Sequence, residues 1–438
     1  MNTARMVRAL ALTALLAPAT AIAAGYSIYE QGGAALGMAG AHTASVHDAT
    51  AMFYNPAAMT SFDHMVISLG GSWITTRNSF AGSQPTANSY PGFNVQESMK
   101  SGNFFPPHLY IATPVGKRMA LGVGVNAPFG LGIEWDNPTT FTGREHATKG
   151  KLQTLAGSAT LALQLNERWS VSAGMTQMYA SVELDKINLS PPVPGGGGGR
   201  VSVANVHLES SLGSSSGSGA NLALLWKPKK DWRVGLNYRA GIDVKVEDGD
   251  ATFTQIPTGN APLDSIVALG LPPAQKVGTT LHFPAMLSVG AAWDAMPGWT
   301  WECDVNWTEW TAFDALPLDF KTTNSIDQSI IENYHDSYRV SIGAEHRLDS
   351  HRYRFGYYYD QEAAPAPSVT VLLPDAARHG ATLGFGFDMG KDKAWTIDLY
   401  NLALFVETRS TEGVSRDAYD GVFKAYVNSF GATITHRW

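Results

Sequence analysis

Large apolar residues alternate with small or polar residues along several segments of this 438-residue chain. Met119, Leu121 and Val123 are separated by single alanine or glycine residues, and the same period of two recurs over residues 65–73 and 155–165. Successive side chains of a β-strand point to opposite faces, so each segment is predicted to be a strand with one strongly apolar face. Alternation alone leaves two alternatives open. In a membrane barrel the apolar face meets lipid, whereas in a soluble barrel it points inward.

The connections between these segments are alternately short and long. Short turns are predicted at residues 114–118, 165–168, 227–231, 294–298, 347–351 and 390–393. Long irregular stretches are predicted at residues 77–103, 130–150, 186–204, 251–279, 317–332, 361–375 and 406–421. Outer-membrane barrels have short periplasmic turns, long extracellular loops and usually an even number of strands. The pattern therefore predicts an all-β, antiparallel transmembrane barrel of about fourteen strands.

The chain begins with the parts of a secretory signal peptide. Arg5 and Arg8 form a positive region, residues 9–17 form an apolar run too short to span a bilayer, and a small-residue cleavage site ends at Ala23. Removal of residues 1–23 is therefore predicted. No later apolar run approaches about 18 residues, which argues against transmembrane helices and favours the membrane barrel.

Composition agrees with an exported barrel and excludes other classes of protein. The chain is 44% hydrophobic with 12 tryptophans, and its net charge of −7 gives no basic surface for nucleic acid. Cys303 is the single cysteine, so an internal disulfide is impossible. Several tryptophans directly follow the predicted short turns, as in the aromatic girdle of a membrane barrel. The last segment ends in Trp438 and resembles the closing strand of outer-membrane proteins, whose terminal aromatic residue is read by the barrel-insertion machinery.

Residues 24–62 differ from the rest of the chain. They are rich in glycine and alanine, contain no lysine or arginine, and show no sustained alternation. A segment with few large side chains can pack tightly in a confined space, and this one precedes the predicted barrel of residues 63–438. It is therefore predicted to plug the lumen. Near its end, Asn55-Pro56-Ala57 has the sequence of a helix start, with Asn55 as N-cap and Pro56 at the first helical position.

A second distinctive position interrupts an alternating segment after residue 125. The sequence there is Asn126-Ala127-Pro128-Phe129-Gly130. Proline has no N–H for a strand ladder and is found at strand ends, edges and bulges. Two interpretations follow. Either the strand ends here and a loop begins, or the strand is kinked inward and leaves a gap in the wall.

Together these features resemble the FadL family of outer-membrane channels for long-chain fatty acids and other hydrophobic compounds. Asn55-Pro56-Ala57 is similar to the family's hatch signature, and residues 126–130 resemble its kinked third strand. Further similar segments are residues 131–135, 238–239, 310–313, 338–339 and 373–378. The resemblance implies that residues 24–62 fold inside the barrel as a hatch. It also implies that the kink is a lateral exit for substrate into the membrane.

The predicted function is passive uptake of hydrophobic compounds across the outer membrane, with long-chain fatty acids as the first choice of substrate. The resemblance implies capture on extracellular loops, movement of the hatch and lateral exit. Leu263, Ile266, Val267 and Leu271 have near-helical spacing, which predicts a short amphipathic helix in a long loop. This helix is either a capture surface for apolar substrate or simple loop packing.

Fatty acid channels of the family keep basic side chains near the substrate carboxylate, and this chain departs from that pattern. It has Ser181 at one matching position and His335 at another. Arg239, Arg339 and His335 are the candidates for binding a head group, although the arginines could equally pair with carboxylates in the lumen. The departure keeps toluene-type aromatic hydrocarbons and alkanes as alternative substrates.

An outer-membrane lipase or protease is the alternative from another class of protein. It would need a catalytic pair on the outer rim, and no catalytic motif supports one. The sequence implies no cofactor and no metal site. We expect a monomer that contacts outer-membrane lipid and lipopolysaccharide.

Overall fold

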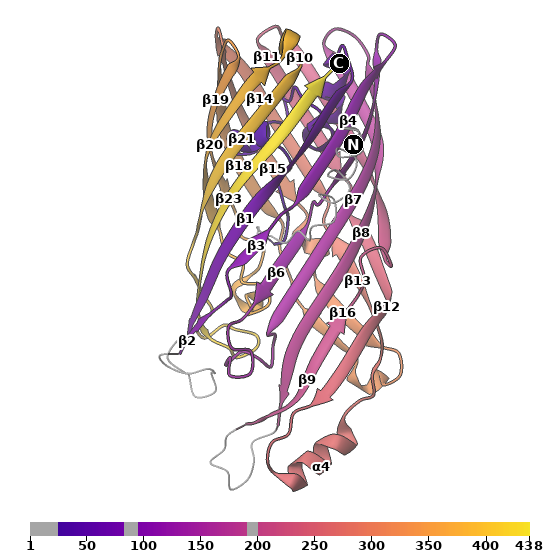
Figure 1. Ribbon diagram of the computed structural model, residues 1–438, viewed down its shortest axis with the longest axis vertical. Coiled ribbons are helices and arrows are strands. Elements are labelled where there is room, and N and C mark those ends of the chain that lie inside the picture. The colour runs from indigo at the N-terminus through magenta and orange to yellow at the C-terminus, as the bar shows by residue number, and fades with distance from the viewer. Residues whose placement is uncertain (1–24, 83–94, 191–199) are drawn as a thin grey trace, which may run out of the picture.

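The computed structural model describes residues 25–82, 95–190 and 200–438, so the predicted signal peptide lies outside the described residues. The described chain forms a closed antiparallel barrel of 14 strands (Figure 1). In order around the barrel these are β1 (Val66–Gly82), β4 (Pro107–Val115), β5 (Met119–Asn126), β7 (Lys149–Gln164), β8 (Trp169–Leu189), β10 (Ser216–Lys229), β11 (Trp232–Arg239), β14 (Met286–Met296), β15 (Trp299–Thr308), β18 (Ser337–Leu348), β19 (His351–Asp360), β20 (Arg378–Met389), β21 (Trp395–Val406) and β23 (Gly421–Arg437). Pairing of β1 with β23 closes the sheet, so the barrel has no free edge. The predicted fold class is confirmed.

Shorter strands extend the wall at the end where the long loops lie, the lower end in Figure 1. They are β2 (Gln96–Ser98), β3 (Gly102–Phe104), β6 (Gly130–Glu134), β9 (Ser202–Glu209), β12 (Ile242–Gln255), β13 (Gln275–Phe283), β16 (Ala315–Phe320), β17 (Gln328–Ile331) and β22 (Arg409–Ser410). Helix α4 (Ala261–Gly270) and the short helices η2 (Trp310–Ala312), η3 (Asn324–Ile326) and η4 (Ala366–Ser368) lie between them in sequence, and η5 (Lys391–Lys393) lies in a short turn. The prediction of irregular stretches was wrong wherever strands enter them. Parts of residues 77–103 belong to β1, β2 and β3, parts of 130–150 to β6, parts of 186–204 to β8 and β9, parts of 251–279 to β12 and β13, parts of 317–332 to β16 and β17, and part of 406–421 to β22. Ladder pairing continues in these segments whatever side chains the strands carry.

The alternating side chains place apolar groups outside and small or polar groups inside. Leu121 and Leu161 are 48% and 46% exposed on the outer wall, whereas Ala120 and Ala162 are buried on the inner face. A soluble barrel would have the opposite arrangement, so the structure selects the membrane alternative. No helix in the described part of the chain is long and apolar enough to span a membrane.

Residues 25–62, which we call the hatch, lie inside the barrel and form α2 (Gly33–Gly37), α3 (Ala51–Tyr54) and the 3-10 helix η1 (Pro56–Ser61). The hatch appears in indigo within the upper half of Figure 1. Small residues on both sides allow close contact with the wall. A Cβ atom added to Gly343 or Gly356 of the wall would lie 2.4 or 2.6 Å from backbone atoms of Met38. The division into a hatch of residues 24–62 and a barrel of residues 63–438 remains our proposal.

Carboxylates of β15 hold the middle of the hatch. One oxygen of Asp304 accepts hydrogen bonds from the backbone N–H groups of His42 and Thr43, both at 3.0 Å. Glu302 accepts a hydrogen bond from the backbone N–H of Ala44 at 2.6 Å. The Thr43 hydroxyl adds a bond of 2.7 Å to Asp304, so four hydrogen bonds attach residues 42–44 to two side chains of one wall strand.

Candidate functional site: a central cavity and a broken strand

The Asn55-Pro56-Ala57 segment joins the hatch to the barrel wall. Asn55 is buried and precedes η1, and its side-chain oxygen accepts a hydrogen bond from the backbone N–H of Ala57 at 3.1 Å. The side-chain amide donates to the carbonyl oxygens of Thr43, at 2.8 Å, and of Leu224 on β10, at 3.1 Å. The predicted helix start is therefore present. One asparagine satisfies groups on η1, the hatch loop and the wall.

The third strand of the barrel is broken between Asn126, the last residue of β5, and Gly130, the first residue of β6. Asn126 is paired with Ala156 of β7, and Gly130 is paired with Gln153. Three residues, 127–129, thus oppose two residues of β7, 154 and 155. This is a β-bulge at the proline, which bends the strand. We call residues 127–129 the strand-3 break.

The backbone at the strand-3 break pairs with the start of the hatch. Ile28 donates a backbone hydrogen bond to the carbonyl of Pro128 at 2.8 Å, and Gly130 donates one to the carbonyl of Tyr26 at 2.9 Å. Ser27 and Phe129 form the antiparallel bridge between these two bonds. The hatch therefore supplies partners to backbone groups that a continuous strand would pair with a neighbouring wall strand.

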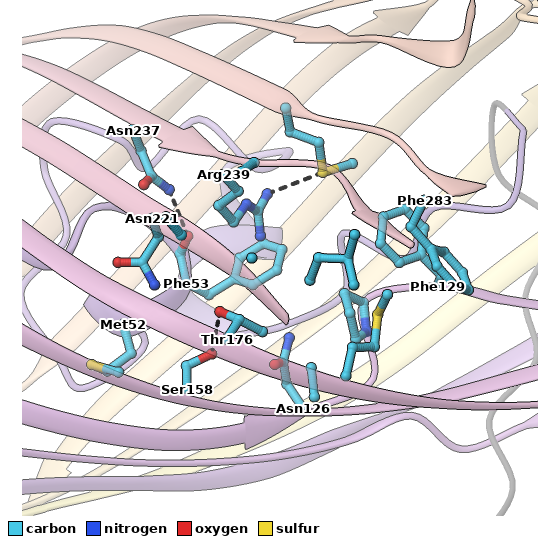
Figure 2. Close-up of a pocket in the computed structure, with 18 of the residues that line it drawn as sticks. Met52, Phe53, Asn126, Phe129, Ser158, Thr176, Asn221, Asn237, Arg239 and Phe283 are labelled. Carbon is cyan, nitrogen blue, oxygen red and sulfur yellow. Dashed lines mark hydrogen bonds between the residues drawn. The ribbon is translucent and has the colours of Figure 1, made fainter. Parts of the chain in front are cut away.

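Beside the break lies a cavity with about 680 Å³ of space, including its open mouth (Figure 2). We call it the central cavity. Met52 and Phe53 of the hatch, Pro128 of the break and wall residues of several strands line it. Polar wall residues that line it are Asn126, Ser158, Thr176, Asn221, Asn237 and Arg239. An apolar cavity with a few convergent polar groups is typical of a small-molecule site.

Arg239 is the charged residue of this lining, and Figure 2 shows it beside Phe53. Its guanidinium carbon lies 3.9 Å from the centre of the Phe53 ring, and one terminal nitrogen lies 3.5 Å from the sulfur of Met286. Among the described residues, no carboxylate forms an ion pair with Arg239, whereas Arg339 on another wall strand is paired with Asp360. A cation with unused donors therefore faces the cavity.

The structure places the other two head-group candidates elsewhere. Arg339 is buried, pairs with Asp360 at 2.8 Å, and has its guanidinium between the rings of Tyr29 and Tyr358. His335 is half-buried, and its ring Nδ1 lies 3.3 Å from the carbonyl oxygen of Asp336. Neither residue lines the central cavity. The three candidates are thus not brought together, and Arg239 is the one beside the cavity.

Sequence reasoning missed the amide side chains that flank Arg239. Asn221 and Asn237 both line the central cavity, and Asn237 donates a hydrogen bond to the carbonyl of Phe53 at 2.9 Å. Asn221 is directly opposite Arg239 in the β10–β11 ladder, and Asn237 is two residues before Arg239 on β11. Both asparagines are on the inner face of their strands. Polar residues on the lumen face of an amphipathic strand were therefore the signal that could have identified them.

Two further apolar cavities lie toward the long-loop end. With their open mouths included, one has about 760 Å³ and the other about 540 Å³ of space, and Leu184 lines both. Phe283 lines the second of these and also the central cavity. The three spaces are thus neighbours in a series, with Leu184 and Phe283 between them. Beyond them, α4 is present as predicted, with Asn260 as N-cap and with Ile266 and Leu269 exposed, the latter by 90%.

Glu332, in the loop between β17 and β18, is a buried acid. Its nearest cation is Arg416, at 3.9 Å, and one carboxylate oxygen has no hydrogen-bond partner among the described residues. Burial raises the pKa of Glu332 from 4.5 to about 8, against a smaller lowering by Arg416. The folded loop therefore favours the protonated acid.

We expect this loop to become less stable as the pH rises from about 4.5 to about 8. The unfolded chain releases the Glu332 proton near pH 4.5, whereas the folded loop keeps it until about pH 8, so the folded state binds more protons in this window. Hydrogen exchange of residues 326–334 between pH 5 and pH 9 measures the effect. Glu332→Gln should remove the dependence, and an unchanged pH profile in that variant would contradict the assignment.

Comparisons with known proteins agree with this geometry. The family model described as outer membrane protein transport protein (OMPP1/FadL/TodX) matches residues 14–438. The long-chain fatty acid transport protein of Escherichia coli O6:H1 is 25% identical over 454 residues, which cover 98% of each chain. Outer membrane protein P1 of Haemophilus influenzae is 25% identical over 407 residues, covering 86% of this chain and 85% of that protein.

Solved structures show the same fold. A Pseudomonas aeruginosa FadL homologue has a TM-score of 0.80 at 20% identity, and the Ralstonia pickettii toluene transporter TbuX has a TM-score of 0.68 at 19% identity. Each match covers 94% of this chain and 99% of the other. Because the family model spans the barrel, the hatch and the broken strand, it covers all the features of the site. The chain therefore belongs to the FadL/TodX family of outer-membrane transport proteins, which are channels and not enzymes.

Proposed function

We propose that this protein carries long-chain fatty acids passively across the outer membrane. The observation that carries this proposal is the guanidinium of Arg239, which faces a largely apolar cavity and has no carboxylate partner among the described residues. A charge held beside apolar surface is costly without a counter-ion, so the site favours a ligand that brings a carboxylate and an apolar chain together. A neutral hydrocarbon would leave the cation unpaired. The names of the relatives that are long-chain fatty acid transport proteins support the same substrate class.

The route follows the cavities. An apolar chain would first contact α4, where Leu263, Ile266, Val267 and Leu271 include exposed or half-buried apolar side chains. It would then pass through the two outer cavities to the central cavity, where the carboxylate meets Arg239. Burial of apolar surface supplies about 25 cal/mol per Å² at each step, so no energy source is required. Movement of the hatch away from the strand-3 break would then release the chain sideways into the membrane.

The outer surface suggests the remaining partners. Exposed Leu, Val and Met side chains around the barrel would contact membrane lipid, with lipopolysaccharide outside them, and Trp438 at the chain end is 57% exposed. We infer that this residue is read by the barrel-insertion machinery. A monomer is sufficient for these contacts, because the barrel is closed by its own strands.

Replacement of Arg239 by methionine tests the substrate. Hydrogen bonds to a charged group contribute about 1.5–3 kcal/mol, which corresponds to an affinity about 10- to 150-fold weaker. We expect a loss of this size for oleate in a binding assay with purified protein. Affinity for methyl oleate, which has no carboxylate, should be unchanged, and Arg239→Lys should retain part of the oleate affinity.

Mass spectrometry of lipid that copurifies with the protein provides an independent check. A bound fatty acid in the wild-type protein that is absent from the Arg239→Met variant would support the proposal. Equal loss of oleate and methyl oleate affinity would instead indicate a damaged cavity. Tight binding of toluene or an alkane with no measurable oleate binding would favour the hydrocarbon alternative.

A further inference from the structure

The barrel wall contains a second interruption, between the sixth and seventh strands. The ladder of β10 with β11 extends from Lys229 and Trp232 to Asn221 and Arg239. Toward the long-loop end the same two wall strands continue as β9 and β12. They pair again only from Glu209 of β9 and Asp250 of β12 onward. Within the described residues, no ladder pair joins residues 210–220 to residues 240–249. We call this stretch the β10–β12 seam.

Two glycines explain why the ladder stops. A Cβ atom added to Gly217 would lie 2.1 Å from the carbonyl oxygen of Asp243, and one added to Gly219 would lie 2.7 Å from the side chain of Ile242. Gly217 and Gly219 share the face of β10 on which Asn221 points into the lumen, since alternate residues of a strand share a face. The start of β12 therefore crosses the lumen side of β10 and does not lie edge to edge with it. Hydrogen bonding in the plane of the sheet is lost at this crossing.

Both edges of the seam border the central cavity. Gly219 and Ala220 of β10 and Ala240 and Ile242 of the seventh strand line it, next to Arg239. The strand-3 break borders the same cavity through Pro128 and Phe129. Strands β7, β8 and β10 lie between the two interruptions, since they pair in that order from β5.

The outer surface at the seam changes from apolar to charged. On one side, Leu222 and Leu236 are exposed, by 52% and 36%. On the other side, Asp243 and Lys245 are exposed along β12. This change is expected where a barrel leaves the apolar band of the membrane, so the seam lies at the outer border of that band.

We propose that the β10–β12 seam is a second lateral opening of the central cavity, through which the apolar chain of a bound amphiphile reaches the outer leaflet. Separation of ordinary wall strands exposes ladder groups to lipid at a cost of several kcal/mol for each unsatisfied group. At the seam, the described residues have one backbone hydrogen bond between the two edges, from Ala240 to Ala220, so the strands can part at lower cost. The inference rests on the proposed uptake function, since a second opening matters only for a transported substrate.

A reversible disulfide across the seam tests this opening. Ala240 donates a backbone hydrogen bond to the carbonyl of Ala220 at 2.9 Å, and opposed residues of such a pair have a Cα separation suited to a disulfide. The variant is Ala220→Cys with Ala240→Cys in a Cys303→Ser background. Its matched control is Leu222→Cys with Tyr238→Cys, a directly opposed pair two residues away in the continuous ladder between the same strands.

Uptake of radiolabelled oleate is measured in cells before and after oxidation, with the strand-3 break either intact or removed. With the break removed, we expect residual uptake that is lost when the 220–240 disulfide forms and returns on reduction. The 222–238 disulfide should have no effect. Recovery on reduction shows that the oxidised protein was folded.

Two results would overturn the second opening and leave the proposed function intact. In the first, removal of the strand-3 break abolishes uptake by itself. In the second, the 220–240 disulfide forms fully but uptake is unchanged, both with the strand-3 break intact and with it removed. Absence of oleate uptake by the wild-type protein in the same assay would be a different result. It would overturn the proposed function and the second opening with it.

Discussion

A continuous third strand should lower oleate uptake to a small fraction of the wild-type rate. Ala127-Pro128-Phe129 is replaced by Thr-Val, so that two residues oppose residues 154 and 155 of β7 and the register runs unbroken from Asn126 to Gly130. The replacement restores ladder donors that Pro128 lacks and removes the extra residue that bends the strand. The main lateral route from the central cavity should then be closed. Uptake of labelled oleate by cells that lack their own fatty acid channel measures the effect.

The control for this change keeps the extra residue. Thr-Pro-Val in place of Ala127-Pro128-Phe129 alters the same flanking side chains but preserves three residues opposite two, so its uptake should stay close to wild type. Heat-dependent migration on a denaturing gel confirms that both barrels have folded. Wild-type uptake by the Thr-Val variant would show that substrate does not leave through the strand-3 break.

Much of the architecture could be predicted because local sequence patterns determine it. A period of two in side-chain size determines which face of each strand is apolar, and the alternation of short and long connections determines the order of hairpins. The helix start at Asn55 and the interruption at Pro128 also depend on the local chemistry of single residues. Each of these features is present in the structure.

The partners of the charged side chains could not be predicted in the same way. Arg239 and Arg339 stand in the same local context, each after a tyrosine on an alternating strand, yet Arg339 pairs with Asp360 on the next strand and Arg239 faces a cavity. The difference is set by ladder register and by which part of the hatch lies opposite. The attachment of residues 42–44 to Glu302 and Asp304 joins segments about 260 residues apart, as the separations of 258 to 262 show, and no local pattern specifies it.

Fixing the start of the hatch to the strand-3 break should have the second large effect on transport. Ser27 and Phe129 are opposed in an antiparallel bridge between the two backbone hydrogen bonds, a position where Cα atoms are about 4.5 Å apart. Ser27→Cys with Phe129→Cys in a Cys303→Ser background should therefore form a disulfide without large backbone movement. Oxidised protein should take up oleate no faster than the variant with a continuous third strand, and reduction should restore the faster rate.

This result would separate movement of the hatch from mere presence of the break. The oxidised and reduced forms of the Ser27→Cys, Phe129→Cys protein share the bulge, the proline and the same altered cavity lining, so a loss of uptake that reduction reverses must arise from the covalent link. A disulfide between Val123→Cys and Ala159→Cys, opposed residues of β5 and β7, controls for cross-linking of the third strand itself. Four hydrogen bonds to Glu302 and Asp304 hold residues 42–44, whereas two backbone hydrogen bonds join residues 26–28 to the strand-3 break. At about 0.5–1.5 kcal/mol for each hydrogen bond, the two bonds at the strand-3 break cost less to lose than the four at residues 42–44, so we expect the start of the hatch to leave the wall while the middle stays attached. Unchanged uptake with the 27–129 disulfide fully formed would mean that substrate passes a stationary hatch.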